Sequence, residues 1–325
     1  MLKNVVYKLP FALINFIQFF KRHSFCILTI PKEKSINKKQ LPMKKIISMV
    51  LCSSIFLLNT KAQDSGSFNI HDSATINRPN QSPYKIHFID APVIAAGIGL
   101  SVYGVHLIDT KDPLSEEKLA TMSKNDIPFF DRGNAGYYSP TADNNSYIPF
   151  YTSFAMPVAI LLINKNERHN AGQILVMYLE TMSITGALFT LSAGTIDRSR
   201  PLVYGTKASL DKRLDANSQR SFYAGHTAAT AAASFFAAKV FADFNPDSKA
   251  KPYIWALAAT LPAITGYFRY QAGMHFLSDN IIGYVIGAGT GILVPQLHKT
   301  KLMKNVTFVP AVGKKYKGVS FVYRF

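Results

Sequence analysis

The sequence predicts an all-α fold: a membrane-embedded bundle of about six helices, followed by a short tail that is a candidate β-hairpin. The first observation behind this prediction is that 48% of the 325 residues are hydrophobic and that the apolar residues gather in six blocks. Each block is close to the roughly 20 residues that cross a bilayer as a helix. The second observation is the charge pattern. Residues 1–45 carry ten Lys/Arg and one acid, residues 299–325 carry seven Lys/Arg and no acid, and the middle is nearly neutral. Basic flanks around a neutral apolar region are typical of cytoplasmic ends of membrane proteins.

The six expected helices are rich in Gly, Ala, Ser and Thr, which allow helices to approach closely in lipid. Polar loops, 109–146 and 195–225, alternate with short basic ones, "NKNERHN" and "NPDSKAK". The expected helices are residues 88–108, 147–163, 172–194, 226–244, 253–268 and 276–297.

A soluble helical bundle is the alternative to a membrane protein. Four charged residues interrupt the apolar blocks, and charges are costly within a bilayer. They are Glu180, Lys239, Asp243 and Asp279. The length and number of the blocks favour the membrane.

The N-terminal region has the features of a targeting segment. Residues 43–62, "MKKIISMVLCSSIFLLNTKA", read as a signal peptide or signal anchor, with lysines before an apolar stretch and small residues near its end. Residues 1–42 are then an upstream extension or a basic cytoplasmic tail. Both cysteines, Cys26 and Cys52, precede Ala62, so the rest of the chain has no disulfide and no thiolate chemistry.

The remaining boundaries follow from composition. Residues 63–87 form a polar linker, 88–298 the helical domain and 299–325 a basic C-terminal tail. The tail alternates apolar and polar residues, which predicts a short hairpin.

Several partners and cofactors are excluded by pattern. The net charge of +17 is concentrated at the two ends, and no basic stripe with interleaved aromatics indicates nucleic-acid binding. No Asp/Glu/His cluster has metal-ligand spacing along the sequence, so we expect no metal and no cofactor. His106, His169 and His298 are expected to be incidental.

The stretch "FRYQAGMHFLSDNIIG" contains the most informative residue pattern. His275 and Asp279 are four residues apart at a helix start, where they share one face. An aspartate at that distance can bond one imidazole nitrogen and leave the other free as a nucleophile. Arg269 adds a guanidinium whose planar donors suit phosphate oxygens.

Two further stretches supply complementary groups. "GTIDRSRPLVYG" carries Arg198 and Arg200 in a loop after an apolar block. "SFYAGHTA" places Gly225 and His226 at a helix start, where free N–H groups favour an anion. His226 is a candidate acid for a leaving oxygen.

These stretches together resemble the type 2 phosphatidic acid phosphatase superfamily, which includes bacterial acid phosphatases and vanadium haloperoxidases. Its pattern is Lys, six residues, Arg-Pro; then Pro-Ser-Gly-His; then Ser-Arg, five residues, His, three residues, Asp. Arg200-Pro201, Gly225-His226 and the series Arg269, His275, Asp279 match in order and spacing. The resemblance covers roughly residues 88–298 and implies an active site at one end of the bundle.

The chain also departs from this pattern. Ala193 stands at the position of the family lysine and Ala224 at that of the second-motif serine, while Tyr223 and Phe268 replace a proline and a serine. Two phosphate donors are therefore absent. The candidates that compensate are cations of the adjoining loop: Arg198 first, with Lys207, Lys212 and Arg213 as alternatives.

The resemblance implies a lipid phosphatase that forms a phosphohistidine. His275 is the implied nucleophile, Asp279 its orienting group and His226 the general acid, while Arg200, Arg269 and Gly225 bind the phosphate. Candidate substrates are phosphatidic acid, phosphatidylglycerol phosphate, a polyprenyl diphosphate and lipid A. Two alternatives stay open: a catalytically degenerate, non-enzymatic membrane protein and a vanadium haloperoxidase-like enzyme.

The family implies a multi-pass protein of the bacterial inner membrane whose active site faces the periplasm. A cleaved signal peptide conflicts with this orientation, because six spans that start outside would leave the catalytic loops inside. The number of spans, the oligomeric state and the cleavage at residues 43–62 stay open.

Overall fold

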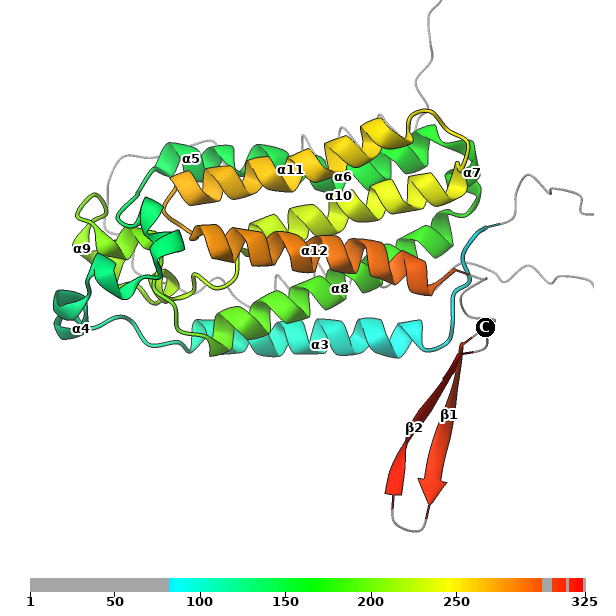
Figure 1. Cartoon of the computed structure of the whole chain (residues 1–325), viewed down its shortest axis with the longest axis horizontal. Coiled ribbons are helices and arrows are strands. Elements are labelled where there is room, and N and C mark those ends of the chain that lie inside the picture. Colours follow the sequence, from blue (N-terminus) through cyan, green and yellow to red (C-terminus); the bar gives the residue numbers. More distant parts are fainter. Residues whose placement is uncertain (1–81, 300–305, 314–315, 324–325) are drawn as a thin grey trace, which may run out of the picture. The chain divides into compact units, whose positions relative to one another are not determined.

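The computed structural model of the chain describes residues 82–299, 306–313 and 316–323 (Figure 1). The predicted extension, the signal segment 43–62 and most of the polar linker lie outside these residues.

Six long helices run roughly along one direction and pack side by side (Figure 1). They confirm the predicted all-α bundle, and their ends fall within a few residues of the expected ones. The helices are α3 (Asp90–Asp109), α6 (Tyr147–Ile163), α8 (Ala171–Thr195), α10 (Gly225–Phe244), α11 (Lys251–Gln271) and α12 (Leu277–Leu297). Within the described part of the chain, four segments are long and apolar enough to cross a membrane: Asp90–Asp109, Pro140–Ile163, Ala171–Thr195 and Leu277–Leu297. The chain is a multi-pass membrane protein.

Helix α10 lies at the centre of the bundle, in contact with α6, α8, α11 and α12. It is buried along most of its length and consists largely of alanine with threonine and serine. A helix surrounded by four others must be narrow, so small side chains replace the larger apolar ones that face lipid. This explains why α10 is less hydrophobic than α3, α6, α8 and α12.

Three glycines on α12 bring that helix against α10. A Cβ at Gly283, Gly287 and Gly291 would lie 2.6, 2.0 and 2.6 Å, respectively, from an alanine carbonyl oxygen in α10 or in the residue just before it. Only glycine permits this approach. Successive contacts move four residues toward the C-terminus on both helices, so α10 and α12 run parallel. Their N-terminal ends therefore lie at the same end of the bundle.

The polar loops at that end contain short helices that the sequence analysis did not predict. The count of about six helices is therefore too low for the described residues, although it is right for the long ones. Leu114, Leu202 and Met274 belong to a small apolar core that packs these loops together. The short helices are α4 (Glu116–Thr121), α5 (Pro140–Asn145), α7 (Lys165–His169), α9 (Leu210–Leu214), η1 (Lys124–Asp126), η2 (Phe129–Asn134), η3 (Pro201–Tyr204) and η4 (Ala216–Gln219), of which only α7 lies at the other end.

Two of the four charges that favoured a soluble bundle, Lys239 and Asp243, are paired at the other end of the molecule. Asp243 forms ion pairs with Lys239 and with Lys299, the latter at 2.6 Å, and accepts a hydrogen bond from the Tyr84 hydroxyl at 2.7 Å. Paired charges near a helix end are compatible with a membrane.

The tail forms the predicted hairpin. Strand β1 (Val306–Gly313) pairs antiparallel with β2 (Tyr316–Tyr323), with Val306 opposite Tyr323 and Gly313 opposite Tyr316.

Candidate active site

Backbone hydrogen bonds join the first two motif segments. The Arg198 N–H donates to the Gln219 carbonyl at 3.0 Å, and the Arg200 N–H donates to the Ser218 carbonyl at 2.8 Å. The Ser221 N–H donates a hydrogen bond to the Arg198 carbonyl at 2.8 Å. The loop that carries Arg200 is thereby held against the segment that leads into α10.

The third motif segment is joined to both of the others. The Leu202 N–H donates to the Gly273 carbonyl at 3.0 Å, and the Ala224 N–H donates to the Asp279 carbonyl at 3.1 Å. Gly273 has a φ of +71°, and a Cβ there would lie 1.8 Å from the Tyr137 carbonyl oxygen. This turn therefore requires glycine. Three segments that are separate in sequence thus converge at the N-terminal ends of α10 and α12.

His275 is held in a defined protonation state. It is 3% exposed, and its Nδ1 lies 2.6 Å from the Ser221 carbonyl oxygen. A carbonyl oxygen only accepts, so Nδ1 carries the proton and Nε2 keeps its lone pair. Burial, together with the positive charges of Arg269 and Arg200, lowers the pKa of His275 well below its ordinary value. The imidazole is therefore neutral near pH 7, with a free nitrogen.

Two arginines in the same electrostatic environment have unused donors. Arg200 and Arg269 are 8% and 4% exposed, and the Nε of each has no hydrogen-bond partner. Arg200 Nη1 contacts only the weak acceptor Met274 Sδ, at 3.0 Å, while Arg269 forms an ion pair with Asp143. Burial, with the nearby charge of Arg269, lowers the pKa of Arg200 to about 9. Buried cationic donors without partners make a site that favours an anion.

His226 lies on the first turn of α10, as predicted. Its ring packs edge-on against Tyr147, with ring centroids 5.3 Å apart, and lies 4.9 Å from the Phe150 ring. After burial, Arg269 and Arg200, a positive charge on His226 also lowers the pKa of His275. Gly225 begins the same helix and is packed under Phe189, whose ring would be 2.5 Å from a Cβ.

The structure corrects the expected contact between Asp279 and His275. The Asp279 carboxylate instead accepts bonds from the Ser221 hydroxyl at 2.6 Å and from the Phe276 N–H at 2.9 Å, and it forms an ion pair with Arg198. Asp279 is in the first turn of α12, where a carboxylate bends back toward the free N–H groups of the helix start. It thus holds Ser221, whose carbonyl holds His275.

Arg198 is also placed differently from the expectation that it replaces the missing lysine. Its guanidinium pairs with Asp279 and with Asp131, the latter at 2.6 Å, and it donates to the Ser278 hydroxyl at 3.0 Å. It also lies 4.7 Å above the Phe276 ring centroid. Two carboxylates neutralise its charge, so Arg198 joins the loops rather than facing an anion.

Neither substituted alanine is open to the surface. Ala193 and Ala224 are both fully buried. The Ala193 carbonyl accepts a bond from Lys111 Nζ at 2.9 Å, so a lysine from another loop caps the end of α8. Ala224 precedes α10 and offers no side-chain cap.

Four residues of this site were missed by sequence reasoning. Asn134 Nδ2 donates to the His275 carbonyl at 2.9 Å, and Asp131, Asp143 and Ser221 make the contacts described above. Three of them lie in the loop 109–146, where no spacing links them to the motifs. Ser221 acts mainly through its backbone carbonyl, which leaves no signal in the sequence.

The comparisons with known proteins agree with the motifs. The sequence model of the PAP2 superfamily matches residues 174–303, a range that contains all three motif segments. Over these residues the chain is similar to the PAP2 superfamily. A solved structure similar to this chain is the first transmembrane PAP2 type phosphatidylglycerolphosphate phosphatase from Bacillus subtilis, at 16% identity and a TM-score of 0.38. That match covers 62% of this chain and 94% of the other. No curated protein sequence matches the chain.

The superfamily match begins within α8, so it leaves out α3, α6 and the loop that supplies Asp131 and Asp143 to the site.

Proposed function

We propose that this protein is a membrane lipid phosphatase that hydrolyses a phosphate monoester or diphosphate through a phosphohistidine on His275. One observation carries the proposal: a buried, neutral imidazole, with Nδ1 anchored to Ser221 and Nε2 free, lies in the field of two buried arginines with unused donors. A nucleophile that is unprotonated and an anion-binding pair beside it are the two requirements of phosphoryl transfer to histidine.

The reaction proceeds in two displacements. His275 Nε2 attacks phosphorus in line, the N–P bond forms, and the bond from phosphorus to the lipid oxygen breaks. Burial and the charges of Arg269 and Arg200 lower the pKa of His226 to about 3 in the empty site. The negative charge of the bound phosphate offsets that of the arginines, so His226 takes up a proton with the substrate and donates it to the leaving oxygen. Water then attacks the phosphohistidine, His226 takes the proton from the water, and the N–P bond breaks to release phosphate and restore the free imidazole.

Positive groups hold the phosphoryl oxygens during both steps. Arg200 and Arg269 each offer donors in a planar fork, and the N–H groups at the Gly225 end of α10 add the positive end of the helix dipole. Arg269 exchanges its bond to Asp143 for one to the phosphate. These groups neutralise the developing charge without a metal in the site.

An apolar groove beside the site supports a lipid as the substrate. It has a volume of about 600 Å³ and lies between α11 and α12, and its lining includes Tyr270 and Leu277, close in sequence to Arg269 and His275. An acyl or prenyl chain in this groove would bring its phosphate to the arginines. Other residues along it are Pro262, Gly266, Tyr267, Ile281, Tyr284 and Val285. Phosphatidic acid, phosphatidylglycerol phosphate, a polyprenyl diphosphate and lipid A all combine such a chain with a phosphate.

Phosphate release from these four lipids by purified protein in detergent tests the proposal. We expect release by the wild type from at least one of them, and no release by His275→Ala. His169→Ala is the matched control, because His169 is an exposed histidine on α7, at the other end of the bundle. Equal turnover by His275→Ala and wild type would contradict the mechanism.

A non-catalytic relative is the alternative favoured by the missing donors at Ala193 and Ala224. It predicts that the wild type releases no phosphate from any of the four lipids, whereas the double variant Ala193→Lys, Ala224→Ser does.

We also propose that the site faces the periplasm of a bacterial inner membrane. The short loops at the other end, 164–170 and 245–250, carry Lys165, Arg168 and Lys249, and short basic loops stay in the cytoplasm. In a variant that lacks Cys26 and Cys52, a cysteine introduced at Ser209 should react with a membrane-impermeant thiol reagent in cells with a permeabilised outer membrane. A cysteine introduced at Ser248 should not. The reverse pattern would contradict this orientation.

A further inference from the structure

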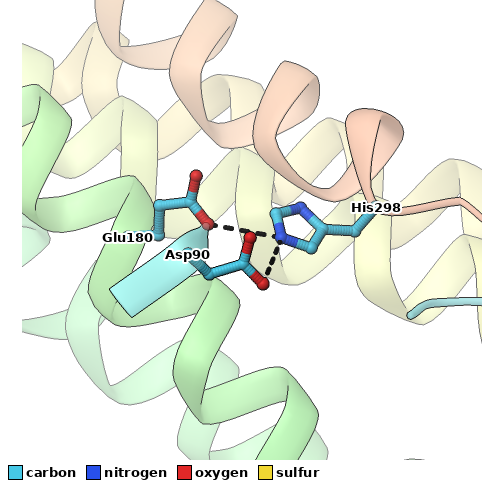
Figure 2. Close-up of side chains that lie close together, drawn as sticks. All are labelled: Asp90, Glu180 and His298. Carbon is cyan, nitrogen blue, oxygen red and sulfur yellow. Dashed lines mark ion pairs between the residues drawn. The ribbon is translucent and has the colours of Figure 1, made fainter. Parts of the chain in front are cut away.

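A second cluster of polar side chains lies at the end of the bundle away from His275. Asp90 begins α3, Glu180 comes from α8, and His298 follows α12; Figure 2 shows the three side chains pointing toward one another. All three residues are buried, and their candidate ligand atoms lie within 4.8 Å of one another. Three segments far apart in the sequence therefore meet at one point.

The histidine in this cluster is oriented as a ligand. Its Nδ1 lies 2.8 Å from the Val294 carbonyl oxygen, so Nδ1 carries the proton in the neutral ring and Nε2 presents a lone pair. That lone pair faces Asp90 Oδ2 at 3.2 Å and Glu180 Oε2 at 3.3 Å. Neither Nε2 nor Glu180 Oε2 has a hydrogen bond of good geometry, although both atoms are buried. Three electron-rich atoms face one another, which is unfavourable unless a positive charge lies between them.

The charge balance of the cluster also indicates a missing positive charge. Among the described residues, no lysine or arginine forms an ion pair with Asp90 or Glu180, and Lys299, the residue after His298, is paired with Asp243. Protonation of His298 would leave one buried negative charge. A divalent cation bound by two carboxylates and a neutral imidazole leaves none.

We infer that Asp90, Glu180 and His298 bind a divalent cation of the Zn²⁺ class. Imidazole and carboxylate ligands suit this class, which prefers four ligands in a tetrahedron. Ligands about 2.0 Å from such an ion lie about 3.3 Å from one another. The distances of Nε2 from the two carboxylate oxygens match that spacing. The carbonyl of Val294 fixes the ring from outside the ligand set, as such carbonyls do in other metal sites.

His87 is the candidate for a fourth ligand. Its ring centroid lies 6.4 Å from that of His298, and its Nε2 is buried without a partner. Its backbone N–H donates to Asp90 Oδ2 at 2.7 Å, which holds the residue beside the cluster. The cation would thus join the start of α3, the middle of α8 and the end of α12.

The test measures zinc binding by the full-length protein in detergent, after treatment with a chelator and equilibration with buffered Zn²⁺. We expect about one zinc ion per chain in the wild type and at least tenfold weaker binding in Glu180→Gln and in Asp90→Asn. These variants keep the side-chain shape while they remove a negative ligand. His169→Ala is the control, because it removes an exposed histidine and should bind zinc as the wild type does.

Thermal unfolding of the same samples supplies a second readout. Zinc should raise the melting temperature of the wild type and of His169→Ala, and should leave that of Glu180→Gln unchanged. The melting curve of each variant without zinc also shows whether it is folded. Equal zinc content in wild type and Glu180→Gln, or no zinc-dependent rise in the wild-type melting temperature, would overturn the inference. Neither readout depends on phosphatase activity, so the inference stands apart from the proposed function.

Discussion

At the scale of single residues, the protonation state of His275 depends on a backbone carbonyl. A neutral imidazole has one donor nitrogen and one acceptor nitrogen, and the partner of one fixes the role of the other. The Ser221 carbonyl accepts a hydrogen bond from Nδ1–H, so Nδ1 keeps the proton and Nε2 is left as the nucleophilic atom. Asp279 accepts a hydrogen bond from the Ser221 hydroxyl, so it acts on His275 through Ser221 rather than by contact with the ring.

This indirect arrangement predicts a measurable effect of Ser221→Ala. The variant removes the hydroxyl bond to Asp279 and keeps the carbonyl, so we expect kcat to fall by about tenfold or less, equivalent to roughly 1.4 kcal/mol, with little change in KM. Asp279→Asn should lower kcat further, because it also removes the negative partner of Arg198. Steady-state phosphate release by both variants is the measurement. If Asp279 acted directly on His275, Ser221→Ala would match the wild type.

The lowered pKa of His275 predicts the acid side of the pH profile. Protonation of Nε2 removes the nucleophile, so activity is lost as pH falls through the pKa of His275 in the free enzyme. Because burial and two arginines lower that pKa well below the ordinary value of about 6.5, the loss occurs at a correspondingly lower pH. We expect kcat/KM to show no loss due to this group between pH 7.5 and 6.5.

The matched variant for the pH profile is Arg200→Gln. It removes one of the two positive charges that lower the pKa of His275, so its residual kcat/KM should begin to fall at a higher pH than in the wild type. Superimposable normalised profiles for the two proteins would contradict this origin of the shift.

At the scale of elements, the start of α10 is where this chain departs from the family pattern, with an alanine in place of the serine. Ala224 precedes the first turn and cannot accept a bond from the free N–H groups there. A serine at such a position stabilises a helix by about 1 kcal/mol relative to alanine.

Ala224→Ser should therefore raise the melting temperature by a few degrees and change turnover by about tenfold or less. The hydroxyl adds a cap and a phosphate donor but takes no part in bond breaking. Ala228→Ser is the control, because Ala228 is equally buried one turn further along α10, away from the helix start. A change in kcat of a hundredfold or more would show that the missing serine is central to the chemistry.

At the scale of the whole molecule, the sequence predicted the long helices well, because each is a continuous apolar block of membrane-spanning length. It also predicted which three segments meet, through the resemblance carried by Arg200, His226 and His275. It could not predict the short helices in the polar loops, which are held by the contacts of Leu114 and Met274 with distant residues.

Two side chains show why the remaining contacts could not be predicted. The spacing of four between His275 and Asp279 implied a contact, yet Asp279 turns toward the helix start and caps Phe276. His298 looked incidental because its partners, Asp90 and Glu180, are more than a hundred residues away in sequence. Spacing along one helix indicates shared faces, whereas contacts between helices depend on packing.

The separation of the two polar sites along the bundle predicts different responses to chelation and to vanadate. The inferred cation lies at the end of the bundle opposite His275, so EDTA should lower the melting temperature while phosphate release continues at temperatures well below it. Vanadate resembles the phosphoryl group in transfer and carries negative charge, so it should inhibit competitively at Arg200 and Arg269. Glu180→Gln is the control: EDTA should change neither its melting temperature nor its turnover, and vanadate should still inhibit it. Loss of wild-type turnover on chelation far below the melting temperature, restored by a divalent ion, would instead identify a metal-dependent phosphatase.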